Sequence, residues 1–280
     1  MESYINPLTD FGFKKLFGTE PNKELLIDFL NQILDKKIKD LTYATNEHLG
    51  NTLVDRRAVF DLYCVSETGE RFIVEMQKAK QNFFKDRSVF YATFPIQEQA
   101  KTSAWNFKLD AVYLVGILDF VFDKKEKEDD FIHYVSLKDQ KGATFYDKLH
   151  FVYIELPKFK KEPAELISQQ DKWLYVLRHL QSLKEMPDPL KEPVFEKLFH
   201  SAALANMNIE ERKSYESSLK YYRDMQNVIE THLEEGEQKG VIRGRTEEKL
   251  KTAQKLKAKG MDPAFIIEIT GLSQEEIEAL

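Results

Sequence analysis

Apolar residues recur along this chain with two periods, and the shorter one marks its most informative stretch. From Arg57 to Lys78, two apolar runs flank the polar turn SETGE at 66–70, which is the pattern of a β-hairpin. Successive side chains of a strand point to opposite faces. We therefore expect Phe60 and the other even-numbered residues on one face of the hairpin, and the odd-numbered residues on the other.

Each apolar run of the hairpin carries one acid, Asp61 in the first and Glu75 in the second. A three-residue loop over 67–69, with Gly69 at a positive φ, pairs Asp61 directly with Glu75. Their Cβ atoms would then lie about 5 Å apart. A two-residue loop would pair Asp61 with Met76 and separate the two acids onto opposite faces. We expect the three-residue register.

Two carboxylates at that separation repel each other unless a cation lies between them. Mg²⁺ and Mn²⁺ bind carboxylate, carbonyl and water oxygens, so the hairpin predicts a metal site at Asp61 and Glu75. The alternative is a solvated strand face whose acids bind nothing, because short motifs of this kind also arise without function.

The longer period, of three to four residues, predicts helices on both sides of the hairpin. The expected helices are a short one over 10–18 that Gly18 closes, Glu20–Leu34, Gln81–Ala104 with a kink or break at Pro95, 164–185, 189–205, and the charged segment Ile209–Lys259. The further expected strands are Leu41–His48, Leu109–Phe122, Phe131–Leu137 and Leu149–Leu156. Beyond Pro163 the chain is therefore expected to be helical.

The composition narrows the setting in which the chain works. Of its 280 residues, 42% are hydrophobic and 31% are charged, which fits a globular protein with charge-rich segments. No apolar run approaches the roughly 20 residues that cross a bilayer, the first residues do not have the pattern of a signal peptide, and Cys64 is the only cysteine. We expect no membrane association, no internal disulfide, and a reducing, cytoplasmic location.

The net charge of −6 opposes binding to nucleic acid, because DNA-binding proteins usually carry a basic face. Any contact with DNA must then be local. The densest basic run beside the two acids consists of Lys78, Lys80, Lys85 and Arg87, and we expect phosphate contacts there. For each lysine the alternative is a solvated surface charge. Arg87 shares a helix face with Tyr91 and other aromatic residues, so it should have an anionic partner.

The hairpin resembles a known family of nucleases. Asp61, thirteen further residues and then Glu75-Met-Gln-Lys is similar to the motif of the PD-(D/E)XK superfamily, in which an acid on one strand and an acid-x-Lys on the next bind the catalytic metal. Gln77 stands in place of that lysine, as in the Rpn branch, the recombination-promoting nucleases and putative transposases. The segments DFGFKKLFG at 10–18 and ELPKF at 155–159 also look like that branch, so the resemblance spans essentially the whole chain.

The resemblance implies an α/β fold of the PD-(D/E)XK, restriction-endonuclease-like type, an αβββαβ mixed sheet flanked by helices, in a bacterial protein of DNA recombination. A C-terminal helical extension would follow. Together with the pattern of elements, it divides the chain into a nuclease-like core at 1–162, a helical pair at 163–208 on or next to that core, and a charged helical tail at 209–280 that ends in a short helix-turn-helix-like segment.

The resemblance also implies an endonuclease that hydrolyses phosphodiester bonds of DNA with Mg²⁺, or with Mn²⁺. The residues that this assigns to catalysis or metal binding are Asp61, Glu75, Gln77 and the Met76 carbonyl. The residues expected nearby in accessory roles are Asp10, Lys14, Lys78, Arg87 and Tyr91. Gln77 cannot act as a cation, but it can orient the attacking water by hydrogen bonds.

Other functions stay open at this point. A nuclease fold without the lysine could be a weak or inactive interaction module acting through its helical tail, and the family name also implies DNA strand transfer. In the tail, Gly236, Gly240 and Gly244 recur every four residues, a spacing that allows close contact between helices and hence a homodimer. The last segment, Asp262–Leu280, resembles half of a helix-turn-helix. Its second helix is acidic, so we expect it to contact protein rather than read DNA.

Overall fold

The computed structural model describes residues 2–45, 47–48, 58–100, 106–122 and 130–280 of the chain. The chain divides into two compact units, Met1–Tyr222 and Arg223–Leu280. The charged segment 123–130, whose composition is that of a loop, lies outside the described residues except for its last residue. No helix in the described ranges combines the length and the apolar character needed to span a bilayer.

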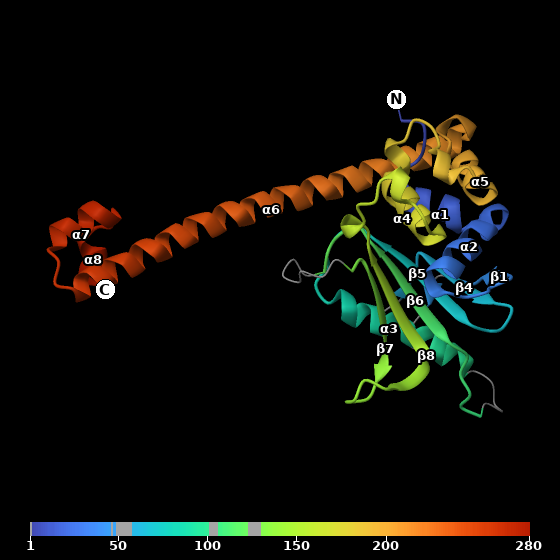
Figure 1. Ribbon diagram of the computed structural model, residues 1–280, viewed down its shortest axis with the longest axis horizontal. Coiled ribbons are helices and arrows are strands. Elements are labelled where there is room, and N and C mark those ends of the chain that lie inside the picture. The colour runs from blue at the N-terminus through green and yellow to red at the C-terminus, as the bar shows by residue number, and fades with distance from the viewer. Residues whose placement is uncertain (1, 46, 49–57, 101–105, 123–129) are drawn as a thin grey trace. The chain divides into compact units, whose positions relative to one another are not determined.

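A mixed β-sheet forms the centre of the first unit (Figure 1). The strands are β1 (Leu41–Tyr43), β2 (Glu47–His48), β3 (Ala58–Val59), β4 (Leu62–Ser66), β5 (Arg71–Gln77), β6 (Val112–Leu118), β7 (Ile132–Lys138) and β8 (Thr144–Glu155). In the described part of the chain the sheet has six strands in the order β1-β4-β5-β6-β8-β7, and β2 pairs only with β3. The central pairs β5–β6 and β6–β8 are parallel, whereas β1–β4, β4–β5 and β7–β8 are antiparallel.

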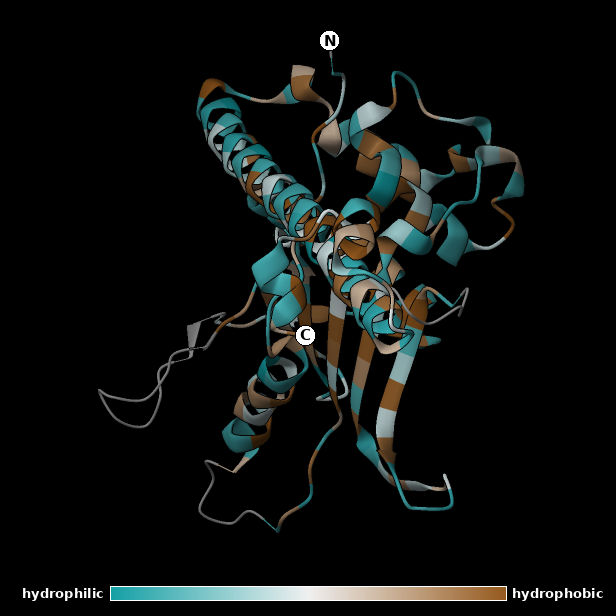
Figure 2. Ribbon diagram, turned by 90° about the vertical axis from the view of Figure 1, so that its left-hand side faces the viewer, coloured by the Kyte–Doolittle hydropathy of each residue, from teal (hydrophilic) through white to brown (hydrophobic). Residues whose placement is uncertain are grey.

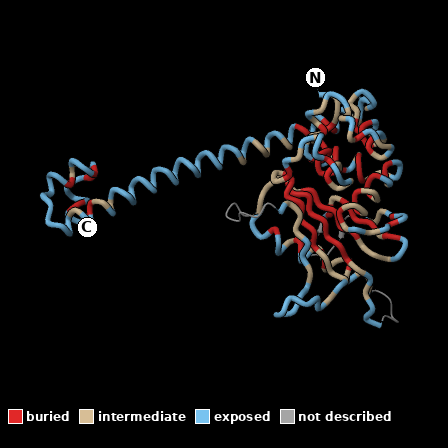
Figure 3. The backbone as a smooth tube through the Cα atoms, in the orientation of Figure 1, coloured by how far each residue is buried: buried red, intermediate tan, exposed pale blue. Residues whose placement is uncertain are grey.

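Helices cover both faces of this sheet (Figure 1). The helices of the described chain are α1 (Asp10–Phe17), α2 (Lys23–Leu34), α3 (Phe84–Gln99), α4 (Gln169–His179), α5 (Pro193–Ala202), α6 (Ile209–Ala258), α7 (Pro263–Thr270) and α8 (Gln274–Glu278), with short 3-10 turns at Glu20–Asn22, Leu156–Lys158, Pro163–Glu165, Leu180–Ser182, Asp188–Leu190 and Leu204–Asn206. One face packs on α3, and the other packs on α1, α2, α4, α5 and the start of α6. Every residue of β6 is buried (Figure 3), as expected for a parallel strand covered on both sides.

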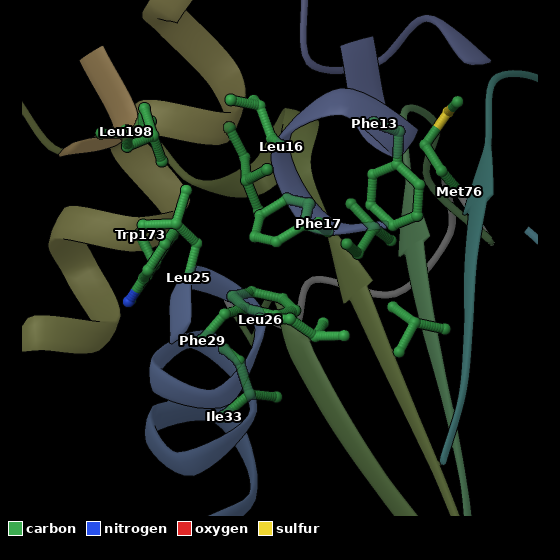
Figure 4. Close-up of a cluster of buried hydrophobic side chains, with 14 of the residues drawn as sticks. Phe13, Leu16, Phe17, Leu25, Leu26, Phe29, Ile33, Met76, Trp173 and Leu198 are labelled. Atoms are coloured by element: carbon green, nitrogen blue, oxygen red, sulfur yellow. The ribbon is translucent and has the colours of Figure 1, made fainter. Parts of the chain in front are cut away.

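The larger of the two cores lies between the sheet and α1, α2, α4 and α5. Phe17 of α1, Phe29 of α2 and Trp173 of α4 meet there, with ring centroids 5.5 to 5.8 Å apart (Figure 4). All three side chains are inaccessible to solvent. Truncating a buried aromatic side chain of this kind to alanine typically destabilises a protein by about 3–5 kcal/mol, so this core fixes α1 and α2 against the sheet.

Several predicted elements differ from the structure in extent. Leu41–His48 is not one strand but two, β1 and β2. The predicted helices 164–185 and 189–205 shorten to α4 and α5 with 3-10 turns at their ends. Pro95 does not break α3, which continues to Gln99, so the helix tolerates the loss of the hydrogen bond that this proline cannot donate.

The second unit consists of α6 from Arg223 onward, α7 and α8. Ala253, Ile266, Leu272 and Ile277 form its core. A capping box is present at the start of α8, where Ser273 accepts from the amide of Glu276 and the Glu276 carboxylate accepts from the amide of Ser273. Most of α6 before this core is hydrophilic (Figure 2), and Gly236, Gly240 and Gly244 lie within it as one continuous helix.

Candidate active site

The hairpin of β4 and β5 has the predicted three-residue register. Leu62 pairs with Val74, the amide of Ser66 donates to the carbonyl of Glu70 over 2.9 Å, and Gly69 has a φ of +88°. A side chain at Gly69 would also approach Asp110, whose Oδ2 lies 2.8 Å from the position of an added Cβ. The glycine turn therefore sets a register in which Asp61 lies opposite Glu75.

The predicted alternation of faces fails at Asp61, just before β4 begins. Phe60 was expected beside Leu62, but it packs on the α3 side of the sheet, against the rings of Tyr63 (5.7 Å) and Tyr91 (5.2 Å). The chain therefore bends at Asp61. An uninterrupted ladder would bond the amide of Met76 to the backbone of residue 60; instead this amide donates to Asp61 Oδ2 over 2.7 Å.

The bend links the two acids by reciprocal hydrogen bonds. The Asp61 amide donates to Glu75 Oε1 (3.2 Å), while the Asp61 carboxylate accepts from the residue after Glu75. Glu75 Oε2 accepts from Gln77 Nε2 (3.1 Å), so Gln77 lies on the same face as Glu75, as strand alternation predicts. Asp61, Glu75 and Gln77 thus form one connected group where β4 begins and β5 ends.

Both acids resist ionisation in this arrangement. Glu75 is only 4% exposed, and burial followed by the charge of Asp61 raises its pKa to about 8. Burial likewise raises the pKa of Asp61, against the opposing effect of the Met76 amide. Two buried carboxyl groups that disfavour each other's charge are typical of functional sites, where a cation can complete them.

Helix α3 contributes Arg87 and Tyr91 to the Glu75 side of the pair. The positive charge of Arg87 opposes the rise in the pKa of Glu75, and the guanidinium lies over the rings of Phe84 (5.3 Å) and Tyr91 (5.6 Å). Its Nη2 atom is buried and has no hydrogen-bond partner among the described residues. Among the described residues, Arg87 Nη2 therefore has no hydrogen-bond acceptor. The guanidinium also lies near Glu75, whose pKa stays raised despite this positive charge.

Helix α1 contributes Asp10 and Lys14 to the Asp61 side. These residues form an ion pair of 2.9 Å and line a cavity of about 450 Å³ together with Asp61. Their charges act on the pKa of Asp61 in opposite directions. The helix is held there by the core contacts of Phe13 and Phe17 (Figure 4).

Lys78 follows Gln77 and points to the opposite face, as alternation predicts. Its ammonium lies over the rings of Tyr221 (5.3 Å) and Tyr222 (5.5 Å) in the first turns of α6. Burial lowers the pKa of Lys78, and the charges of Asp10, Asp61 and Asp119 act to raise it. Lys78 therefore lies among acids on the Asp61 side, although it does not extend along the Gln77 face.

Asp119 and Tyr222 also lie near the acid pair, and the sequence did not predict either of them as a site residue. The Asp119 amide donates to the Gln77 carbonyl (2.9 Å), and its carboxylate accepts from the Tyr222 hydroxyl (2.8 Å), so both residues lie at the same edge of the sheet as the acid pair. Asp119 gave a signal, since it interrupts a long apolar run as Asp61 and Glu75 do. Tyr222 gave no such signal, because no local pattern indicates that the start of α6 packs near the ends of β5 and β6.

Lys80 and Lys85, the other two predicted phosphate contacts, are exposed and lie near Phe122. Lys80 donates to the carbonyl of Phe122, and the ammonium of Lys85 lies 5.0 Å from the centroid of its ring. These two lysines and Arg87 belong to the loop before α3 and its first turn. Lys78 is half-buried and belongs to the other face.

The residues present suit a hard divalent cation, with few protein ligands. In the part of the chain that the structure describes, no three His, Cys, Asp or Glu side chains are arranged to hold a metal. Arg71 and Gln77 direct their backbone groups toward β6, so even-numbered residues, including Met76, direct theirs toward β4 and Asp61. Two carboxylates and one carbonyl, completed by water or phosphate oxygens, match the donor set of Mg²⁺.

A mixed sheet with an acid before one strand and Glu-x-Gln at the end of the next defines a class, the PD-(D/E)XK-like nuclease fold, here with a C-terminal helical extension. Residues 7–232 match the family described as PD-(D/E)XK nuclease family transposase, and the chain belongs to this family. Residues 246–280 match the description Rpn/YhgA-like nuclease family, C-terminal HTH domain. No curated protein and no solved structure matches the chain. The fold and the family expected from the resemblance are thus confirmed.

The helix-turn-helix match bears on the expected protein contact of Asp262–Leu280. A domain of this kind suggests DNA binding, in contrast to the protein contact that the acidic α8 indicated. The matched region begins at 246 and so includes the lysine-rich end of α6, where Lys249, Lys251, Lys255, Lys257 and Lys259 lie. The matched region therefore has a basic segment as well as the acidic α8.

Proposed function

We propose that this chain is an endonuclease that hydrolyses phosphodiester bonds of DNA with the help of Mg²⁺ or Mn²⁺. The observation that supports this most strongly is the linked pair of half-buried Asp61 and buried Glu75, both resistant to ionisation. Isolated buried acids destabilise a fold. Placing two of them together is unfavourable unless a cation joins them when the site is in use.

Different residues of the site would bind the metal, orient the attacking water and bind the phosphate. Asp61, Glu75 and the Met76 carbonyl would hold the metal, which lowers the pKa of a bound water and stabilises charge developing on the phosphate. Gln77 would orient the attacking water, because its amide already lies 3.1 Å from Glu75. Arg87 would bind the scissile phosphate through its guanidinium group, which lies beside Glu75.

Residues outside the pair would support binding. Asp10, Lys14 and Lys78 would set the charge around Asp61, and Tyr91 would hold Arg87 in place by its ring. Lys80 and Lys85 would contact flanking phosphates, as local basic groups on an acidic protein. The helix-turn-helix domain would add a second DNA contact. The proposal also includes a role in recombination and a homodimer that forms through the tail. It includes a cytoplasmic location as well, which the single, buried Cys64 favours.

Nicking of supercoiled plasmid DNA tests the proposal. Wild type should nick with Mg²⁺ or Mn²⁺ and not with a chelator. Asp61→Asn should lose at least about 100-fold in rate, since even indirect ligand contacts change metal-site activity by 10- to 100-fold. Asp110→Asn, at the opposite end of β5 beside the hairpin turn, is the matched control and should nick normally. Equal nicking by wild type and Asp61→Asn would remove Asp61 from the mechanism.

A second candidate is a nuclease-fold interaction module without activity. The observations that favour it are Gln77 in place of the usual lysine and the two-carboxylate donor set. Titration with Mn²⁺ separates the candidates, because an inactive module should not bind the ion at Asp61 and Glu75. A strand-transfer activity would yield joined DNA ends in the same plasmid assay, in place of nicks alone.

A further inference from the structure

A second hollow lies at the start of α3, apart from the cavity beside Asp61. It has a volume of about 270 Å³, and four phenylalanines line it together with two exposed lysines: Phe83, Phe84, Phe120, Phe122, Lys80 and Lys85. Phe84, Phe120 and Phe122 pack against one another, with ring centroids 5.9 to 6.2 Å apart. Their mutual contacts give the hollow an apolar wall.

Phe83 lies at the same hollow in an unusual state. Its side chain is 79% exposed and makes no ring contact with any described residue, while its backbone has a φ of +61°. A left-handed backbone is unfavourable for a bulky residue, and so is an exposed aromatic ring. Strained positions of this kind occur at ligand-binding sites, and Phe83, unlike other exposed rings of the described chain, adjoins a hollow lined by two lysines.

Two lysines and one acid, Asp86, line this hollow, and Arg87 connects it to the acid pair. Lys85 lies over the ring of Phe122 at 5.0 Å, and Lys80 donates to the Phe122 carbonyl, so both ammonium groups are fixed at its rim. Arg87, one helical turn after Phe83, lies over Phe84 and acts on the charge of Glu75. A DNA strand with one phosphate at Arg87 would bring its neighbouring nucleotide to Phe83.

We propose that Phe83 stacks on an unpaired nucleobase of the DNA strand whose phosphate lies at Asp61 and Glu75. This inference rests on the proposed function, because it takes DNA as the substrate. Exposed aromatic rings beside basic side chains bind single strands through base stacking and phosphate contacts, with little dependence on sequence. Paired bases are stacked inside a duplex and cannot offer a free face to Phe83. The substrate class is therefore single-stranded or locally unpaired DNA.

The test measures binding without cleavage. Full-length protein with a chelator is titrated into a short single-stranded oligonucleotide that carries 2-aminopurine, whose fluorescence is quenched when the base stacks. Phe83→Ala should bind about 5- to 150-fold more weakly, the range that corresponds to one lost stacking contact, and should lose the quenching. Phe83→Tyr keeps the ring and should behave as wild type. Circular dichroism of each variant checks that the fold is unchanged.

The chain offers a matched control in Phe107. Its ring is 81% exposed and its φ is +65°, so it shares both unusual features of Phe83. It lies near the opposite end of α3, where Gln99 and Asp110 are hydrogen-bonded, about 24 Å away along a helix of that length. Phe107→Ala should bind and quench as wild type does.

Three results overturn the inference: wild-type binding by Phe83→Ala, an equal loss in Phe107→Ala, or an equal loss on the same probe in paired form. Failure of the proposed function looks different. If wild type quenches the probe but does not cut it with Mg²⁺, the stacking site stands and the nuclease proposal fails. If wild type cuts the DNA and Phe83→Ala binds normally, the stacking site alone fails.

Discussion

Replacing Glu75 by glutamine should stabilise the metal-free protein, and more so as the pH rises. Its pKa is raised from 4.5 to about 8 in the folded protein. The stability that protonated Glu75 contributes is therefore fully present below pH 4.5 and is lost as the pH rises through 8. At 1.36 kcal/mol for each pKa unit, the raised pKa makes the fold less stable than below pH 4.5 by about 3 kcal/mol at pH 7 and about 5 kcal/mol above pH 9.

Glutamine removes that cost but loses one hydrogen bond. Glu75 accepts from both the Asp61 amide and Gln77, and a glutamine has only one acceptor oxygen. With about 1 kcal/mol for the lost bond, Glu75→Gln should be about 1 kcal/mol less stable than wild type at pH 4, about 2 kcal/mol more stable at pH 7 and about 4 kcal/mol more stable above pH 9.

Urea unfolding followed by tryptophan fluorescence measures this directly. Both tryptophans, Trp105 and Trp173, belong to the unit Met1–Tyr222, so the signal reports the unit that contains the site. Measurements at pH 4, 7 and 9 with a chelator show how the difference in unfolding free energy between Glu75→Gln and wild type changes with pH. A Glu75→Gln protein no more stable than wild type at pH 9 would refute the burial-based account of the acid pair.

Glu155→Gln is the matched control with the opposite sign. Glu155 is 1% exposed, but it binds Lys158 at 2.6 Å and His133 at 3.1 Å. Burial acts to raise its pKa, yet these partners and the Phe122 amide hold that pKa below its usual value. Its stabilising effect is present above pH 4.5 and lost in acid. Glu155→Gln should lose about 3 kcal/mol at pH 7, as when a buried ion pair is broken.

Three further predictions concern the turn, the missing lysine and the basic rim. Gly69→Ala should lower the free energy of unfolding by about 1–2 kcal/mol, because alanine is strained at a φ of +88°; an unchanged urea midpoint would contradict this. Gln77→Lys would place a cation beside Glu75, so the pKa of Glu75 should fall, and cleavage should begin at lower pH than in wild type; an unshifted pH profile would contradict it. Lys85→Gln should reduce the slope of log binding constant against log salt by about one, the value for one lost phosphate contact, and an unchanged slope would remove Lys85 from the DNA contact.

The sequence allowed the hairpin and its register to be predicted because both depend on local rules. Loop length and a glycine at 69 determine which residues pair, and apolar periodicity identifies strands and helices. The bend at Asp61 could not be predicted, since alternation assumes an uninterrupted strand. That bend moves Phe60 to the α3 face and turns the Asp61 carboxylate toward the Met76 amide. Asp61 and the Glu75–Met76 segment are therefore joined by side-chain hydrogen bonds that an ideal ladder would not contain.

Long-range contacts account for what else was missed. Tyr222 reaches Asp119 across 103 positions of sequence, and no local pattern can indicate such a meeting. The exposed state of β7 was also hidden, because an apolar run does not reveal that its strand lies at the edge of a sheet. Packing of the start of α6 against the sheet thus supplies a part of the site that the motifs leave out.

Calorimetric titration of Mn²⁺ at pH 7, in buffers of different ionisation enthalpy, tests most directly whether Asp61 and Glu75 form one metal site. With a pKa of about 8, Glu75 is mostly protonated at pH 7 and must release its proton to bind the ion. Wild type should bind Mn²⁺ with the release of about one proton, and Asp61→Asn and Glu75→Gln should not bind it. Equal binding by all three proteins, or binding by none, would contradict the account.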